Sequence, residues 1–168
     1  MQSAQPESNA NAAAELSAIS FAARIEALIG PLQLWLAWLP PLAARASVGW
    51  VFLESGWGKL HNLEGVTEFF ASLGIPAPHL QAPFVAGIEF FGGALLLLGL
   101  ATRFAALPLI GVMTVAILTA LRDQIASLSD LFGLAEFCYI VLLAWLAVSG
   151  AGSCSLDALL RRRPSARS

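Results

Sequence analysis

Three glutamates, Glu54, Glu89 and Glu136, lie inside apolar stretches of this sequence. Inserting an ionisable side chain into the hydrocarbon of a bilayer costs roughly 2.5 to 3.5 kcal/mol, so the charges that persist there are usually paired or functional. Lys59 lies near the end of the stretch that holds Glu54, and Arg122 directly follows another apolar stretch; these two residues supply the opposite charge. Carboxylates beside cations in a dry environment can bind a polar ligand or relay protons. These five residues are therefore the candidate site.

Four apolar runs must position these side chains, and they cover residues 42–60, 83–100, 104–121 and 132–150. The 168-residue chain is 58% hydrophobic and only 12% charged, a composition outside the soluble range. Each run has close to the ~20 residues that a membrane-spanning helix needs, and short connectors make sequential helices antiparallel neighbours. The sequence therefore predicts an all-α, polytopic membrane protein with an antiparallel four-helix transmembrane bundle over residues 42–160.

The candidate site residues fall at one depth of this predicted bundle. Glu54 and Glu89 lie six residues inside the outer ends of their runs, and Glu136 lies four inside. At about 1.5 Å per residue, all three carboxylates are ~6 to 9 Å below the outer boundary, close to the level of Lys59 and Arg122. Two interpretations stay open: a paired network that only fixes helix register, or a polar pocket open to the extracytoplasmic side in which Glu89 binds a ligand or relays protons.

The basic residues predict the orientation of the chain. Seven of the nine fall on one side of a protein with four crossings, including Arg103 and the basic tail at 161–168. Cytoplasmic segments are rich in Lys and Arg, so both termini are predicted to be cytoplasmic. Residues 1–15 are expected to form a disordered tail, and residues 16–41 an interfacial amphipathic helix, with an extra crossing as the alternative.

Composition and spacing exclude several classes of function. A formal net charge of -2 does not provide the basic surface that nucleic-acid binding requires. Cys138 and Cys154 are sixteen positions apart and form no C-x-x-C pair, so neither dithiol exchange nor structural zinc binding is expected. No metal site, nucleotide motif or flavin fingerprint is recognisable. We therefore expect that the chain is not a complete oxidoreductase by itself.

Glycines predict where the helices approach one another most closely. Gly49 and Gly56 are seven residues apart and share one helical face. Gly92 and Gly93 follow Glu89 by three and four residues, which places them directly beside it. Small residues usually mark tight contacts between membrane helices. Glu89 is therefore expected at a helix interface rather than facing lipid.

Short motifs follow one another in a fixed order between about Arg45 and Leu160. They are Arg45 with Gly49-Trp50-Val51-Phe52, Gly56-Trp57-Gly58-Lys59-Leu60, Leu73-Gly74-Ile75-Pro76, Glu89-Phe90-Phe91-Gly92-Gly93, Gly99-Leu100-Ala101-Thr102-Arg103, Gly150-Ala151-Gly152 and Ser155-Leu156-Asp157. In this order and spacing they resemble the DoxX family of small four-helix bacterial membrane proteins. The resemblance implies that Arg45, Lys59, Glu89 and Arg103 are the motif positions, with structural or ligand-binding roles.

The same resemblance implies a multi-pass protein of the bacterial inner membrane that is associated with redox enzymes. The leading hypothesis is a membrane subunit with a polar pocket for a quinone or another small substrate near the outer leaflet. The expected partners are the lipid bilayer and a redox or maturation enzyme, and a homo-oligomer is left open. The alternatives are a non-catalytic anchor or assembly factor for a partner enzyme and, with less support, a small permease.

Overall fold

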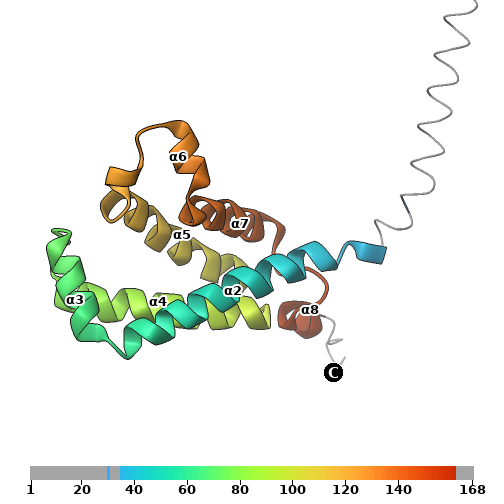
Figure 1. The fold of residues 1–168 in the computed structure, drawn as a ribbon. Coiled ribbons are helices and arrows are strands. Elements are labelled where there is room, and N and C mark those ends of the chain that lie inside the picture. The colour runs from blue at the N-terminus through green and yellow to red at the C-terminus, as the bar shows by residue number, and fades with distance from the viewer. Residues whose placement is uncertain (1–29, 31–34, 162–168) are drawn as a thin grey trace, which may run out of the picture. The chain divides into compact units, whose positions relative to one another are not determined.

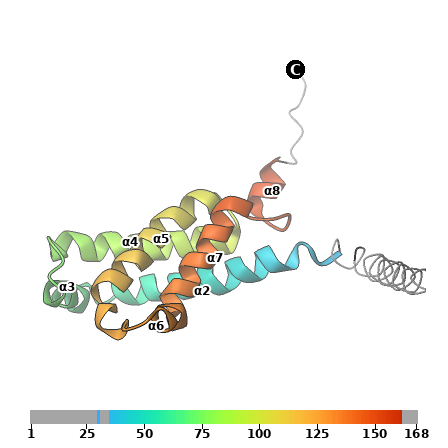
Figure 2. The same cartoon turned by 90° about the horizontal axis from the view of Figure 1, so that it is seen from above.

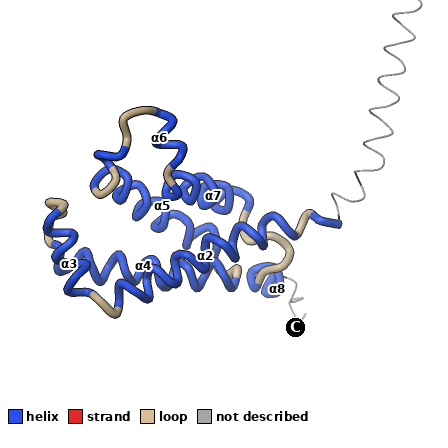
Figure 3. Tube along the Cα trace, in the orientation of Figure 1, coloured by secondary structure: helices blue, strands red, loops and turns tan. Residues whose placement is uncertain are grey.

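The computed structural model describes residue 30 and residues 35–161, and all regular structure in this part is helical (Figure 3). The helices are α2 (Leu39–Leu60), α3 (Leu63–Ser72), α4 (Pro78–Leu98), α5 (Thr102–Thr119), the 3-10 turn η1 (Arg122–Gln124), α6 (Leu128–Gly133), α7 (Ala135–Ser149) and α8 (Leu156–Arg161). The predicted all-α class is confirmed for these residues. The expectations for residues 1–15, for most of 16–41 and for nearly all of 161–168 lie outside the described residues.

Two helices, α4 and α5, are each long and apolar enough to cross a membrane. Helix α2 is longer, with 22 residues, but it carries Arg45, Glu54 and Lys59. Helix α7 is apolar but has only 15 residues, fewer than the ~20 that match the hydrocarbon thickness. A helical protein with two candidate membrane spans is therefore established, and the four crossings stay a prediction.

Prolines set the starts of two helices. Helix α2 begins at Leu39 with prolines in its first turn, and α4 begins at Pro78. A proline is well tolerated in a first turn because the N–H that it lacks would have no partner inside the helix. Both helices therefore begin a few residues before the apolar runs 42–60 and 83–100 that predict them.

The apolar run 132–150 is not one continuous helix, which corrects the prediction of a single span there. Leu134 has φ −73° and ψ 134°, an extended conformation that separates α6 from α7. Gly133, just before the break, is a weak helix former. The amphipathic helix α3 was not predicted either. It begins at Leu63 and is capped by Asn62, whose side chain accepts a hydrogen bond from the Gly65 amide.

Helix α6 starts earlier than the apolar run because Ser127 and Asp130 form a capping box. The Ser127 hydroxyl donates to the Asp130 carboxylate at 3.0 Å, and the amides of Ser127 and Ala126 donate to it at 2.8 and 3.1 Å. These hydrogen bonds, led by the one from the Ser127 hydroxyl, hold the pKa of Asp130 below its ordinary value.

The helices pack as two closely associated pairs. Helix α2 packs along α4 and α5 packs along α7, while α4–α5 and α2–α7 contacts join the pairs (Figures 1 and 2). The buried core takes residues from α2, α4, α5 and α7. Its members are Val48, Phe52, Leu96, Ala105, Ala106, Leu109, Met113, Leu143 and Leu146.

Glycines make the contact between α2 and α4 close. A Cβ added to Gly56 would lie 2.3 Å from the backbone N of Phe90, and one added to Gly93 would lie 2.4 Å from the backbone N of Leu53. A Cβ on Gly49 would lie 3.0 Å from the carbonyl oxygen of Gly93. The prediction that glycines mark tight helix contacts is confirmed at these positions.

A Gly56→Ala change is therefore expected to lower the free energy of unfolding by about 1 to 3 kcal/mol, because the added methyl group overpacks the interface. Gly58→Ala is the matched control on the same helix, since a Cβ there meets nothing within 4 Å. The measurement is thermal unfolding in one detergent, followed by circular dichroism. Equal melting temperatures for the two variants would contradict the expectation.

Candidate functional site

A cavity of about 810 Å³ lies among α2, α3, α4, α5 and α7. Most of its wall is apolar, with aromatic residues on α3 and small residues on α5. The polar residues on the wall are Ser55, Lys59, Asn62, Gln81, Glu89, Thr119, Glu136 and Tyr139. The size and the mixture of apolar surface with a few polar groups are typical of small-molecule sites.

Glu89 is the charged centre of the cavity wall. It has no exposed surface, and Lys59 Nζ donates to both of its carboxylate oxygens. The Ser55 hydroxyl donates a further hydrogen bond to Oε2 at 2.9 Å. The Lys59 side chain is 28% exposed, so Lys59 contacts the buried carboxylate and is also partly open to its surroundings. A buried charge is tolerable when it is paired and hydrogen-bonded in this way.

Helix geometry explains why two residues of α2 reach one carboxylate. Ser55 and Lys59 are four residues apart, so they lie one turn apart on the same face of α2. That face is next to the close contact at Gly56, which brings α4 within reach of a serine side chain. Ser55 was missed by sequence reasoning. Its spacing of four from Lys59 is the signal that could have identified it.

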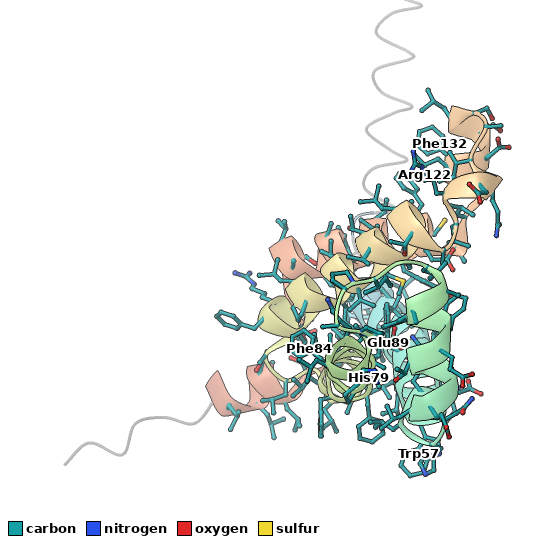
Figure 4. The ribbon with its side chains drawn as sticks, turned by 90° about the vertical axis from the view of Figure 1, so that its left-hand side faces the viewer. Trp57, His79, Phe84, Glu89, Arg122 and Phe132 are labelled. Carbon is teal, nitrogen blue, oxygen red and sulfur yellow. The ribbon has the colours of Figure 1, made fainter. Side chains whose placement is uncertain are left out.

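The structure brings together three of the five candidate residues. Glu136 on α7 lines the same cavity as Lys59 and Glu89. Glu54 is exposed and does not line this cavity, but it lines an adjoining open groove whose wall also includes Ser55 and Lys59. Arg122 is exposed in η1, outside the cavity, and Figure 4 draws it apart from Glu89. Similar depth along the helices therefore did not place all five side chains at one site.

Arg45, a family-motif residue, lies in a second polar cluster. It is 1% exposed, and it donates from Nη2 to the carbonyl oxygen of Cys154 and from Nε to that of Pro41, at 3.4 Å. A Cβ on Gly99 would lie 1.6 Å from Arg45 Nη1, and Gly99 has φ +65°. Position 99 therefore requires glycine for both space and backbone conformation.

Asp157 completes this cluster by holding the turn between α4 and α5. Its amide donates to the carbonyl oxygen of Gly99 at 3.1 Å, and its Oδ1 accepts from the amide of Ala101 at 3.1 Å. Ala101 adopts an unusual left-handed conformation with φ 48°, which these hydrogen bonds help to maintain. Arg103 follows this turn and is exposed. The motif residues thus divide between the cavity, with Lys59 and Glu89, and the α4–α5 turn.

Neither cluster has the ligands of a metal centre. Among the described residues, no group of three or more His, Cys, Asp or Glu side chains is placed to hold a metal ion. Cys138 and Cys154 are exposed and unpaired in the same part of the chain. The cavity instead offers an ammonium donor, a hydroxyl donor and carboxylate acceptors on an otherwise apolar wall, which suits a ligand with carbonyl or hydroxyl groups.

The ion pair gives a prediction about stability. Lys59→Met would leave the buried Glu89 carboxylate without its cation, at an expected cost of about 2 to 4 kcal/mol in the free energy of unfolding. Glu89→Gln is expected to cost less, because Lys59 is partly exposed and can reach solvent. The double variant should recover part of the summed loss, as a double-mutant cycle of thermal or denaturant unfolding would show. Simple addition of the two single losses would mean that the pair does not couple.

Sequence comparison connects this fold with known proteins. The DoxX family model matches residues 40–122. "Putative oxidoreductase CatD" of Bacillus subtilis is 34% identical over 118 residues, which cover 69% of this chain and 83% of CatD. "Inner membrane protein YqjF" of Escherichia coli is 27% identical over 122 residues, covering 73% of this chain and 92% of YqjF.

A membrane protein of Mycobacterium tuberculosis is 35% identical over 140 residues, covering 76% of this chain and 86% of its own length. No solved structure matches the chain. The relatives named as inner membrane or membrane proteins place the apolar helices in a bilayer. With the family match and the extent of these similarities, the chain belongs to the DoxX family of bacterial membrane proteins.

Proposed function

We propose that this protein is a redox-associated subunit of the bacterial inner membrane that binds a quinone in the cavity beside Glu89. The observation that carries the proposal is the cavity of about 810 Å³, whose apolar wall holds a fully buried carboxylate paired with Lys59. A charge pair so costly to bury points to a role beyond filling space. That CatD is named as an oxidoreductase supports a redox setting for the family.

Quinone chemistry suits the groups on the wall. The ring is flat and apolar, and its two carbonyl oxygens accept hydrogen bonds, one of which Lys59 can donate with the ammonium proton that Glu89 does not take. Reduction of a quinone to its hydroquinone takes up two electrons and two protons. A partner enzyme would supply the electrons, and the carboxyl groups of Glu89 and Glu136 would pass protons to and from the ring oxygens.

The proposal includes four membrane crossings, made by α2, α4, α5 and α7, with both termini in the cytoplasm. The pairing of Gly49 with Gly93 and of Gly56 with Phe90 supports an antiparallel α2 and α4. The short α7 would cross with α6 at its outer end, and a 15-residue helix is accommodated by local thinning of the bilayer. In this orientation the Lys59–Glu89 pair lies in the outer half of the membrane.

Binding of a quinone is the direct test. Protein purified in mild detergent and then washed should retain or rebind quinone, measured by solvent extraction and the absorbance change on borohydride reduction. Ser55→Ala removes the hydrogen bond that holds Glu89 Oε2 in place at the cavity wall, and it is expected to weaken binding roughly three- to tenfold. Lys59→Met and Glu89→Gln remove the ion pair, and a loss of about tenfold or more is expected for each.

Glu68→Gln is the matched control, since Glu68 is an exposed carboxylate on α3 that lies outside the cavity wall. It should bind quinone like the unchanged protein. Variants are compared only if they elute as one species and unfold cooperatively. Absence of quinone from the unchanged protein, with no binding when it is added, would rule out the quinone site and favour a role as an anchor for a partner enzyme.

A further inference from the structure

Some residues of the cavity wall are themselves largely exposed, so they mark its mouth, the place where the cavity opens. Phe84 on α4 is 65% exposed and Val115 on α5 is 50% exposed. Pro108 and Gly111 on α5 also line the cavity and are exposed. All four are apolar, and they belong to the two helices that are long and apolar enough to cross a membrane. This part of the opening therefore faces hydrocarbon, whereas the exposed wall residue Asn62 is polar.

On α4, Glu89 at the charged part of the wall and Phe84 at the mouth lie at opposite edges of the helical face that lines the cavity. The residues of α4 on the cavity wall are Gln81, Phe84, Val85, Ile88 and Glu89, spaced as a single face of a helix. At 100° per residue, Phe84 and Glu89 are about 140° apart around α4. Glu89 is at the edge beside α2, where Lys59 and Ser55 contact it, and Phe84 is at the exposed edge (Figure 4).

The cavity of about 810 Å³ has room for more than a flat ring. Helices α4 and α5 are in contact, and they separate with distance from the turn that joins them (Figure 1). On α5 the wall contains Gly111 and Ala116, and Ala120 follows directly after the helix; the small side chains of all three take up little of the cavity. An apolar chain can therefore run along α5 from the mouth to the charged wall.

We infer that the ligand is a lipid-dissolved molecule with a polar head and a long apolar tail, which enters sideways from the bilayer between α4 and α5. The head lies against Lys59, Ser55 and Glu89, and the tail leaves past Phe84 and Val115. This inference rests on the proposed function and narrows its ligand to quinones with an isoprenoid tail. A water-soluble substrate would instead use the polar end of the wall, near Asn62 and Thr119.

The test compares a tailed benzoquinone with its tail-less parent. Gly111→Phe places a ring at the mouth, where an added Cβ meets nothing within 4 Å, so the change is expected to fold. It should weaken binding of the tailed quinone about tenfold or more, while affinity for the tail-less parent changes less than about twofold. Gly111→Leu is a second, smaller variant expected to act in the same direction.

Gly87→Phe is the control, because Gly87 lies on α4 with nothing within 4 Å of an added Cβ and is outside the cavity wall. It should leave both affinities unchanged. If the Gly111 variants affect both quinones equally or neither, while Lys59→Met and Glu89→Gln still abolish binding, the sideways entry is wrong and the quinone site stands. If neither quinone binds the unchanged protein, the proposed function fails and the inference with it.

Discussion

The close approach of α2 and α4 determines where this protein can place its charges. Gly56 meets the backbone at Phe90, the residue next to Glu89, so the tightest helix contact and the buried carboxylate are neighbours in sequence. Any side chain at position 56 would push the helices apart and lengthen the path from Ser55 to Glu89. The glycines therefore determine the electrostatics of the cavity as well as its packing, because they bring hydrogen-bond donors within reach of a buried carboxylate.

Hydropathy predicted three long helices correctly, but it placed their ends a few residues away from their positions in the structure. The runs 42–60, 83–100 and 104–121 correspond to α2, α4 and α5, displaced by a few residues because prolines and polar residues begin helices before the apolar stretch does. The break at Leu134 could not be predicted from composition, since the apolar residues continue on both sides of it. Helix α3 was missed because its polar and apolar residues alternate at helical spacing within a connector.

The sequence predicted the level along the helices at which the candidate residues lie, but not which neighbouring helix each side chain faces. The rise per residue places Lys59 and Glu89 at one level, and they are indeed paired. The rotation of each helix about its axis depends on packing, which a single sequence does not contain. For this reason the exposed Glu54 is not part of the cavity wall, while its neighbour Ser55 contacts Glu89. Arg45 could not be interpreted from sequence because one of its partners is a backbone carbonyl 109 residues further along the chain.

The hydrogen bonds of Asp157 connect the end of the chain to its middle. Ala101 and Asp157 are 56 residues apart, and synthesis proceeds from the N-terminus, so the α4–α5 turn emerges long before the carboxylate that holds it. The carbonyl group of Cys154, which accepts a hydrogen bond from Arg45, is synthesised 109 residues after Arg45. Both contacts can therefore form only after residues 154–157 have been synthesised, so the position of Arg45 and the α4–α5 turn are fixed late.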